Sequence, residues 1–489
     1  MQLWFPFVTL GATVISGFLV ESMARPCISG FPPLRRCLLN ALLTGAQYGA
    51  WLALCGTPVL AAVLTTALTL CLVIGSNIKL SILGEPMLFC DVVAARSFLQ
   101  HPKFYLFSIP LSGRIAVVGG MIALPVMLVV FFTPALLPHV AGGCLLIAGM
   151  LGLWAIPATR WVPTPDAQHD IGRLGLPGSL FLYWRCWRHE IAMQPEAAPP
   201  VTPSGKPAYD IVIVIQCESF ARPGDLMAQQ AHDPARIPVL PALTRAETMA
   251  SHWGTLHVSG FGAYTMRTEY GVLFGQEESM LGFRAYDPFL TAGRDTALSL
   301  PAIMGKAGYD CTFVHPHDLR FYARAQLMPA CGFSHIVGEE AFPHTARPGM
   351  PYVEDMALAQ EIGAVAAKAK GPAFIYAVTM ENHGPWPATG PNGPQTAFDH
   401  YLRHLQNSDR MLGTLTDMLS QMGKKGLLVF FGDHRPSIPG MIIPTPQRGT
   451  PYVVIPVGTG TPAAPMKQDL TPAQLHHLIL RNTLGGYAG

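Results

Sequence analysis

The first third of the chain consists of apolar stretches that are long enough to cross a membrane. Five are readable, at residues 3–21, 37–55, 58–76, 115–135 and 138–157. A helix needs about 20 apolar residues to cross about 30 Å of hydrocarbon. Only 13% of the 489 residues are charged and mean hydropathy is +0.32, as expected for a chain that lies partly in lipid. We therefore expect a membrane domain of about five helices over residues 1–158.

A connector rich in proline, glycine and arginine follows, at residues 159–208. Its segment 180–193 contains Trp184, Trp187 and neighbouring arginines, a composition typical of the head-group zone of a bilayer. We interpret residues 159–208 as an interfacial linker with one helix at its centre. An ordinary linker helix is an equally good interpretation.

Residues 209–489 have the pattern of a separate α/β domain. The apolar runs IVIVIQC, CTFVHP, FIYAVTM, GLLVFFG and PYVVIPV alternate with helical patterns at 297–307, 356–367 and 401–422. Continuous apolar strands between helices indicate a sheet that is covered on both faces. The net charge of +2 and the absence of a basic run argue against a nucleic-acid partner. Cys311 and Cys331 could form a disulfide if this domain lies outside the cytoplasm.

Polar residues follow three of the predicted strands. Glu218 comes directly after IVIVIQC, His383 follows FIYAVTMEN, and Asp433 and His434 follow GLLVFFG. Ligands of α/β sheets collect at the carboxyl ends of the strands. Thr265 lies in the glycine-flanked segment GFGAYTMRTEYGVLFG, which could present its hydroxyl at the start of a helix. Taken singly, each residue has an ordinary explanation as a turn or cap residue; together they favour a functional site.

The chemistry of these residues indicates a metal-dependent nucleophile. Carboxylates and an imidazole suit Mn²⁺, Mg²⁺ or Zn²⁺ and do not select firmly among them. A bound metal lowers the pKa of a hydroxyl and neutralises charge on a phosphoryl oxygen. A threonine nucleophile needs such activation.

The domain resembles the alkaline phosphatase/sulfatase superfamily, and most closely the lipoteichoic acid synthase-like phosphoglycerol transferases. The resemblance runs from about Ile211 to Ile455. It is carried, in order, by VIQCESF, GFGAYTMRTEYGVLFG, DTALSLPAIMGKAGYDCTFVHPHDLRFYAR, MENHGPW, FFGDHRP and TPYVVI.

The resemblance implies a role for each matched position. The expected metal ligands are Glu218, Thr265, Asp433 and His434. Thr265 is also the expected nucleophile, and His383 is expected at the substrate phosphate. The expected glycerol-phosphate pocket is formed by His315, His317, Tyr322 and Arg324. Tyr322 and His317 depart from the family pattern, in which a tryptophan and often a carboxylate stand there.

The implied activity is transfer of phosphoglycerol from phosphatidylglycerol, through a covalent threonine intermediate, to a hydroxyl of a glycan or glycolipid. Mn²⁺ is the expected metal. The implied location is the bacterial inner membrane, with the catalytic domain on the periplasmic or outer side. The Lys and Arg residues between the apolar stretches favour the opposite orientation, with an external N-terminus. We expect the orientation of the family, because its lipid donor and glycan acceptors lie outside.

Other functions remain possible on the sequence alone. A phosphoethanolamine transferase uses the same type of Glu/Thr/Asp/His set. A phosphodiesterase would use water as the acceptor. A sulfatase is disfavoured because its nucleophile matures from Cys or Ser rather than Thr. A non-catalytic membrane regulator built on an inactive enzyme domain is disfavoured because all four expected ligands are present.

Overall fold

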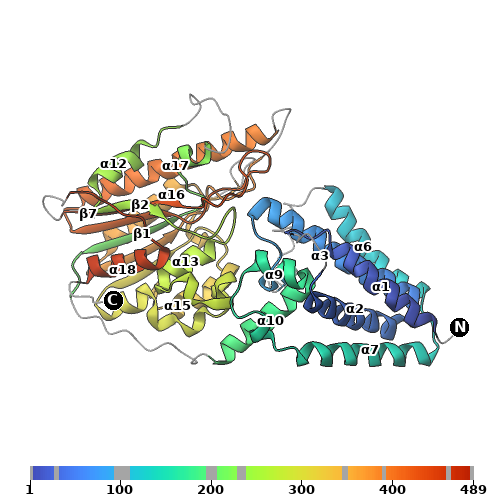
Figure 1. Ribbon diagram of the computed structural model, residues 1–489. Helices are drawn as coiled ribbons and strands as arrows, with labels where there is room; N and C mark the ends of the chain where they lie inside the picture. Colours follow the sequence, from blue (N-terminus) through green and yellow to red (C-terminus); the bar gives the residue numbers. More distant parts are fainter. Residues whose placement is uncertain are drawn as a thin grey trace. The chain divides into compact units, whose positions relative to one another are not determined.

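The chain folds into two compact units, residues 1–193 and 194–489 (Figure 1). The computed structural model describes residues 4–26, 32–92, 111–193, 206–227, 238–343, 351–387, 393–458 and 464–484. The break between the units lies within the segment that we interpret as a linker.

The first unit is entirely helical over its described residues. Its five apolar helices are α1 (Phe5–Glu21), α2 (Leu34–Cys55), α3 (Pro58–Leu83), α6 (Leu111–Val130) and α7 (Leu136–Ala155). Among the described residues, α2, α3 and α7 are long and apolar enough to cross a membrane, whereas α1 and the Val118–Val130 part of α6 are shorter apolar helices. The predicted membrane domain of about five helices is therefore confirmed.

Small residues bring α2 and α7 into close contact. A Cβ atom added to Gly49 of α2 would lie 2.6 Å from the backbone N of Leu146, and one added to Gly142 of α7 would lie 2.3 Å from the backbone N of Ala53. In lipid, helices associate through such close packing because the hydrocarbon around them supplies little hydrophobic driving force. The glycines thus explain why these two helices pair.

Three further helices complete this unit: α8 (Ala158–Trp161), α9 (Ala167–Leu174) and α10 (Leu176–Met193). Helix α10 contains the predicted helix at 180–193. Its Arg185 donates hydrogen bonds to the carbonyl oxygens of Leu153 and Ile156, at 2.9 and 2.8 Å, and lies 4.9 Å above the ring of Trp154. An arginine at the carboxyl end of α7, stacked on a tryptophan, suits the interfacial zone that the sequence predicted.

An eight-stranded sheet forms the centre of the second unit, in the order β4-β3-β5-β1-β6-β7-β2-β8. The strands are β1 (Ile211–Cys217), β2 (His252–Leu256), β3 (Asp310–Val314), β4 (His335–Val337), β5 (Ala373–Val378), β6 (Gly426–Gly432), β7 (Thr450–Val457) and β8 (Met466–Lys467). From β4 to β6 all neighbours are parallel, whereas β7 is antiparallel to both β6 and β2. The five predicted apolar runs are all strands, which confirms the α/β class.

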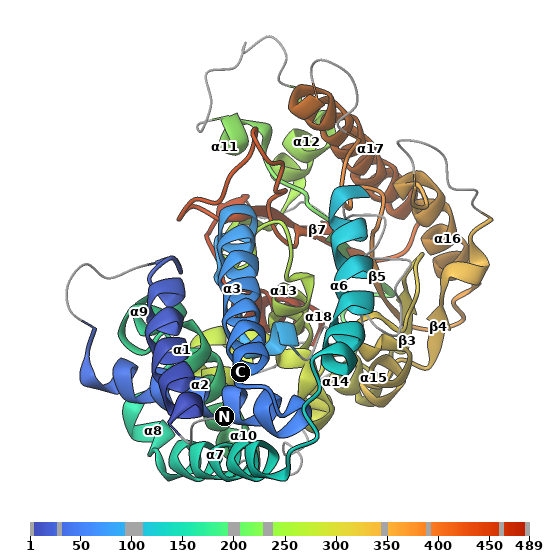
Figure 2. The same ribbon diagram turned by 90° about the vertical axis from the view of Figure 1, so that its right-hand side faces the viewer.

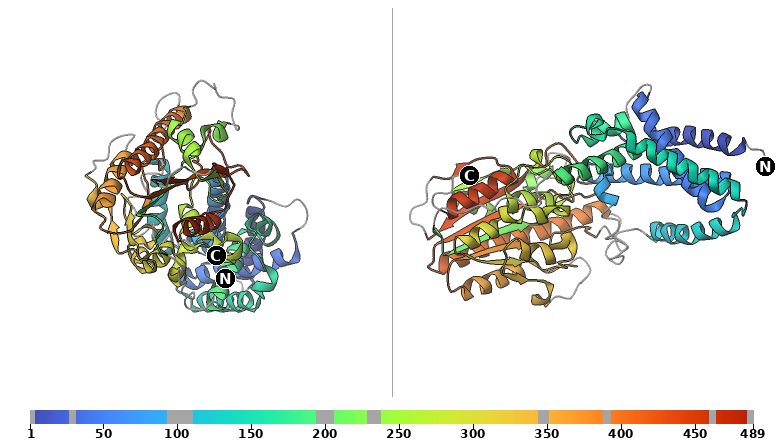
Figure 3. Two further views of the ribbon diagram at one scale, coloured as in Figure 1. Left: turned by 90° about the vertical axis from the view of Figure 1, so that its left-hand side faces the viewer. Right: turned by 90° about the horizontal axis from the view of Figure 1, so that it is seen from below.

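Helices cover both faces of the sheet (Figures 1 and 2). One face carries α12 (Pro241–Met249), α16 (Asp355–Lys368) and α17 (Gly393–Gln421). The other carries α13 (Thr265–Phe274), α14 (Leu300–Lys306), α15 (Arg324–Ala330) and α18 (Pro472–Thr483), as Figure 3 shows from two further sides. The other described helical segments of this unit are the short α11 (Pro223–Met227) and 3₁₀ turns at Glu278–Met280, Gly282–Tyr286, Pro288–Leu290, Ala292–Arg294, Thr296–Leu298, Phe321–Ala323 and Glu339–Ala341. The strands are therefore buried on both sides, which is why their sequences are continuously apolar.

Two local features of this unit follow from its packing. Cys311 and Cys331 are both buried free thiols, so the possible disulfide between them is not formed. Asp409 on α17 accepts hydrogen bonds from the backbone N–H groups of Ala242 and Leu243, at 3.0 and 2.7 Å, and so satisfies two N–H groups in the first turn of α12.

Candidate metal and nucleophile site

The candidate site lies at the carboxyl ends of three adjacent parallel strands, β5, β1 and β6. Glu218 directly follows β1, and Asp433 and His434 directly follow β6. Because β1 pairs in parallel with both β5 and β6, the ends of all three strands meet at one edge. The strand-end residues that the sequence analysis selected are therefore brought together by the sheet order.

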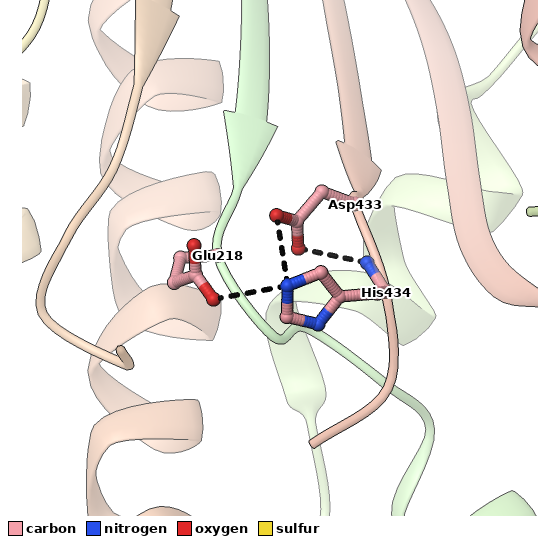
Figure 4. A group of neighbouring side chains, drawn as sticks. All are labelled: Glu218, Asp433 and His434. Atoms are coloured by element: carbon pink, nitrogen blue, oxygen red, sulfur yellow. Dashed lines mark hydrogen bonds and ion pairs between the residues drawn. The ribbon is translucent and has the colours of Figure 1, made fainter. Parts of the chain in front are cut away.

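Glu218, Asp433 and His434 form a buried cluster with metal-ligand geometry. One ligand atom from each residue lies within 4.8 Å of the other two. The Nε2 atom of His434 is 3.5 Å from Oε1 of Glu218 and 3.5 Å from Oδ2 of Asp433. In Figure 4 the two carboxylates point toward the imidazole from the ends of two neighbouring strands.

The unused acceptor atoms of the cluster fit a cation. Asp433 Oδ1 accepts hydrogen bonds from the backbone N–H groups of Ser219 and His434, both at 2.8 Å. Asp433 Oδ2 is buried and has no hydrogen-bond partner among the residues that the structure describes. Burial, together with the nearby Glu218 carboxylate, raises the pKa of Asp433 to about 7. A divalent cation would supply the positive charge that balances these two carboxylates.

The proton on His434 is placed by a backbone contact. Its Nδ1 atom lies 3.1 Å from the carbonyl oxygen of Arg435. A carbonyl oxygen only accepts, so Nδ1 carries the proton and donates it. In the neutral imidazole the Nε2 lone pair faces the two carboxylates, as in histidine metal ligands that are oriented through their other nitrogen.

Thr265 adds a hydroxyl to the same cluster. It is the first residue of α13, where the glycine-flanked sequence was expected to begin a helix, and its Oγ1 atom lies 3.4 Å from Nε2 of His434. The preceding Tyr264 has a positive φ of 77°. Non-glycine residues in this left-handed region are uncommon and concentrate at functional sites. The strained turn therefore presents the hydroxyl to the cluster.

Arg324 forms a buried ion pair beside this nucleophile. Its Nε–H donates to Oε1 of Glu269 at 3.2 Å, and a second hydrogen bond links Nη2 with Oε2. Glu269 lies four residues after Thr265 and so on the same face of α13. His315 also contacts the guanidinium. Its Nδ1–H donates to the Val378 carbonyl at 3.0 Å, and its Nε2 accepts from Arg324 Nη1 at 3.3 Å. The sequence analysis missed Glu269, although its spacing from Thr265 on a helix was a readable signal.

Tyr322 and His317 lie around the Arg324 side chain. Tyr322 has a positive φ of 55°, is 36% exposed, and has the guanidinium 4.9 Å from its ring centroid. His317 stacks on Phe321 with ring centroids 5.8 Å apart. Burial and the neighbouring His383 lower the pKa of His317 to about 4. At neutral pH this histidine is uncharged and can both donate and accept one hydrogen bond.

His383 meets Tyr352, a second residue that the sequence analysis missed. The Tyr352 hydroxyl lies 3.3 Å from His383 Nδ1, and the same nitrogen lies 2.6 Å from the carbonyl oxygen of Gly384. The carbonyl requires Nδ1 to carry the proton, which leaves Nε2 as the basic atom. Burial, with a smaller effect of Glu218, raises the pKa of Tyr352 to about 12. No motif in the sequence pointed to Tyr352, which lies 31 residues from His383.

Comparison with known proteins identifies the family. The sulfatase family model matches residues 210–480, more than half of the chain. The chain belongs to the sulfatase family. This confirms the resemblance to the alkaline phosphatase/sulfatase superfamily. The matched range contains the whole candidate site, so the cluster described above is that of a sulfatase-family domain.

Two curated relatives of this sulfatase-family chain come from Rhizobium meliloti. It is 27% identical over 418 residues to the capsular polysaccharide biosynthesis protein RkpI, covering 80% of this chain and 76% of the relative. It is also 27% identical over 230 residues to a putative cyclic beta-1,2-glucan modification protein, covering 44% of this chain and 35% of that one.

Among solved structures, the lipooligosaccharide phosphoethanolamine transferase A of Neisseria meningitidis, an integral membrane protein, has a similar fold over both units. The TM-score is 0.60 with 12% identity, covering 99% of this chain and 95% of that chain. At this identity the match shows the fold: apolar helices followed by a sulfatase-like α/β domain. The protein is thus a membrane-anchored member of the sulfatase family.

Proposed function

We propose that the protein transfers a phosphoglycerol group from phosphatidylglycerol to a hydroxyl of a glycan or glycolipid, with Thr265 as the covalent carrier. The observation that carries the proposal is the approach of Thr265 Oγ1 to 3.4 Å from His434 Nε2, beside the carboxylates of Glu218 and Asp433. This arrangement supports the proposed roles of Thr265 as nucleophile and of its neighbours as metal ligands.

In this proposal Glu218, Thr265, Asp433 and His434 hold one divalent cation, with Mn²⁺ preferred and Mg²⁺ or Zn²⁺ as alternatives. The cation, when bound, lowers the pKa of the Thr265 hydroxyl and neutralises negative charge on the phosphoryl group. The chain's own contribution is geometric. The strand ends and the strained Tyr264 turn hold the four ligands in place before the lipid binds.

In the first half-reaction, Thr265 Oγ1 forms a bond to phosphorus while the bond from phosphorus to the diacylglycerol oxygen breaks. The hydroxyl proton of Thr265 passes to the departing alkoxide, so diacylglycerol leaves as the neutral alcohol. Arg324 stabilises the charge that develops on the phosphoryl oxygens. The phosphoglycerol group remains on Thr265.

In the second half-reaction, an acceptor hydroxyl attacks the same phosphorus and the Thr265 oxygen leaves. In the neutral imidazole of His383 the proton lies on Nδ1, which donates to Gly384, so we propose that Nε2 accepts the acceptor proton. The protonated imidazole donates a hydrogen bond to a phosphoryl oxygen and then transfers its proton to the departing Thr265 oxygen. His383 is thus proposed both to hold the phosphoryl group and to move the proton.

The pocket of His315, His317, Tyr322 and Arg324 is proposed to hold the glycerol moiety. Arg324 and the neutral His317 supply hydrogen-bond donors and an acceptor that match two vicinal hydroxyl groups. Tyr322, which is partly exposed, supplies an apolar surface for the glycerol carbons. His315 acts through Arg324, because it is 1% exposed and contacts the guanidinium rather than the open site.

The acceptor and the location rest on different support. The relative RkpI is named for capsular polysaccharide biosynthesis, which supports a glycan acceptor.

An odd number of spans places the N-terminus and the catalytic unit on opposite sides of the membrane. We propose that the catalytic unit lies outside the inner membrane. Reporter fusions at the C-terminus test this: activity of a cytoplasmic reporter with none from a periplasmic reporter would exclude the external orientation.

The donor and the nucleophile are tested in one experiment. The full-length protein is incubated with head-group-labelled phosphatidylglycerol or phosphatidylethanolamine, and the peptide containing Thr265 is analysed by mass spectrometry. We expect a phosphoglycerol adduct from the first lipid, and none in Thr265→Ala, with diacylglycerol release abolished. A phosphoethanolamine adduct would instead assign the alternative transferase activity. Unchanged diacylglycerol release by Thr265→Ala would exclude Thr265 as the nucleophile.

A further inference from the structure

A cavity of about 260 Å³ lies against α13, the helix that begins at Thr265. Its walls come from α13, the 3₁₀ turns directly after it, His257 just after β2, and the start of α18. The residues that matter for its chemistry are Arg267, Tyr270, Glu277, Glu278, Ser279 and Thr471. None of them belongs to the metal cluster or to the pocket around Arg324.

The cavity is connected to the nucleophile through Arg267. The Arg267 guanidinium lies 4.0 Å from the ring centroid of Tyr264, the strained residue directly before Thr265. Its Nε–H donates to the carbonyl oxygen of Tyr286 at 3.2 Å. Arg267 therefore lies between the cavity and the turn that presents the nucleophile.

The two faces of α13 contact different sites. Thr268 Oγ1 donates to the Asp433 carbonyl at 2.7 Å, and Glu269 pairs with Arg324, so both residues face the metal cluster and its pocket. Arg267, Tyr270 and Gly271 line the cavity. A ligand in the cavity thus contacts the helix that begins at Thr265 without competing for the metal ligands.

The lining selects a class of ligand. Carboxylates of Glu277 and Glu278, the hydroxyl of Ser279 and the guanidinium of Arg267 offer both acceptors and donors, while Leu281 and Pro288 provide apolar wall. Glu277 is held in place by the Thr471 hydroxyl, which donates to its Oε1 at 2.7 Å. Two carboxylates disfavour a phosphate or another anion, and the many polar groups disfavour an acyl chain. A neutral polyhydroxylated ring forms hydrogen bonds with the polar groups and packs its carbon atoms against the apolar residues.

We propose that this cavity binds one sugar residue of the acceptor glycan, an inference that rests on the proposed transfer to a hydroxyl acceptor. Its volume suits a single monosaccharide unit. A glycan held there by one residue can extend past Arg267 and Tyr264 to place a neighbouring hydroxyl at the loaded Thr265. The cavity thereby selects the acceptor, whereas the pocket around Arg324 selects the donor.

The test uses the full-length protein in detergent with two variants of adjacent exposed residues. Ser279→Trp places an indole at the cavity mouth. Met280→Trp, at a side chain that is 80% exposed and does not line the cavity, is the matched control. Three quantities are measured: the Thr265 adduct formed from labelled phosphatidylglycerol, the KM for a soluble glucan oligosaccharide acceptor, and saturation-transfer NMR signals from that oligosaccharide.

For Ser279→Trp we expect normal adduct formation, loss of the NMR signals, and a KM for the oligosaccharide raised by at least about tenfold, since one or two hydrogen bonds to the sugar are lost. Met280→Trp should match the wild type in all three measurements. Unchanged KM and unchanged NMR signals in Ser279→Trp would overturn the cavity assignment while leaving the proposed transfer intact. If the wild type forms no adduct, the proposed transfer fails. The NMR signals then still test the cavity: their loss in Ser279→Trp supports sugar binding there, and their retention overturns it.

Discussion

Arg324 and Glu269 form a buried ion pair that joins α15 to the helix of the nucleophile. The Arg324 side chain is 3% exposed and that of Glu269 is completely buried. Because Glu269 lies four residues after Thr265 on α13, the pair couples the position of the arginine to that of the proposed nucleophile. An arginine that is already paired keeps its orientation while donors remain for a phosphoryl oxygen.

The first prediction concerns this pair. Arg324→Ala should lower the free energy of unfolding by about 3–5 kcal/mol, because Glu269 would be left charged and buried without a partner. The double variant Arg324→Met, Glu269→Leu should recover most of that loss. The control is Arg320→Ala, which removes an ion pair with Asp318 in the same segment. Arg320 is 66% exposed, so its loss should leave the melting temperature nearly unchanged. Equal melting shifts for Arg324→Ala and Arg320→Ala would contradict a buried pair.

A second prediction concerns the metal cluster. Added Mn²⁺ should raise the melting temperature of the wild type, since a ligand at 100 times its Kd stabilises the folded state by about 2.7 kcal/mol. Glu218→Gln removes one charged ligand and should abolish most of this shift. Glu339→Gln, at an exposed carboxylate outside the cluster, should behave as the wild type. Elemental analysis of the purified variants checks the same point directly, and metal retained in full by Glu218→Gln would remove that residue from the ligand set.

The end of β6 supplies the third prediction. A Cβ atom on Gly432 would lie 2.0 Å from the carbonyl oxygen of Phe220, in the loop that carries Glu218. Gly432→Ala should therefore cost about 2–3 kcal/mol and weaken metal binding, because the backbone of that loop must move. Gly371→Ala is the control, since nothing lies within 4 Å of a Cβ atom there. Thermal melting with and without Mn²⁺ compares the two, and a neutral Gly432→Ala would show that the loop is free to shift.

The fourth prediction is a pH dependence that arises from His317. Its pKa is lowered from 6.5 to about 4 by burial and by His383, so the folded state disfavours the protonated form. The stability contributed by the neutral form is present above pH 6.5 and is lost as the pH falls toward 4. Between pH 7 and pH 4.5 the wild type should lose roughly 2–3 kcal/mol more than His317→Gln. Melting curves across this range, with the exposed His335→Gln as a control, test the sign as well as the size.

The strands and their carboxyl ends were predictable because each signal is local. A run such as IVIVIQC or GLLVFFG is apolar throughout only if both of its faces are covered, and a polar residue directly after it must lie at the sheet edge. Glu218, Asp433 and His434 follow from that reasoning. Three strands were not predicted. The short β4 and β8 have three and two residues and leave no periodic pattern, and β2, with the sequence HWGTL, is not a continuous apolar run.

Other features depended on pairs that are distant in sequence. The sequence places Glu269 four residues after Thr265, but its partner Arg324 lies 55 positions later. Glu339 and Glu340 are nearer to Arg324 in sequence but are exposed, whereas the actual partner is completely buried. Tyr352 is similar: its hydroxyl meets His383 only because the segment before α16 returns to the carboxyl end of β5.

The amino-acid sequence by itself determined the two-part organisation, the α/β class and the identity of the strand-end residues, because hydrophobic periodicity and chain breaks are local properties. Only the tertiary structure decided which of these residues meet. The order β5-β1-β6 brings Glu218 to the Asp433–His434 pair, and backbone carbonyls choose the nitrogens of His434 and His383 that carry the proton. Such contacts depend on strand order and loop geometry, which no local pattern in the chain encodes.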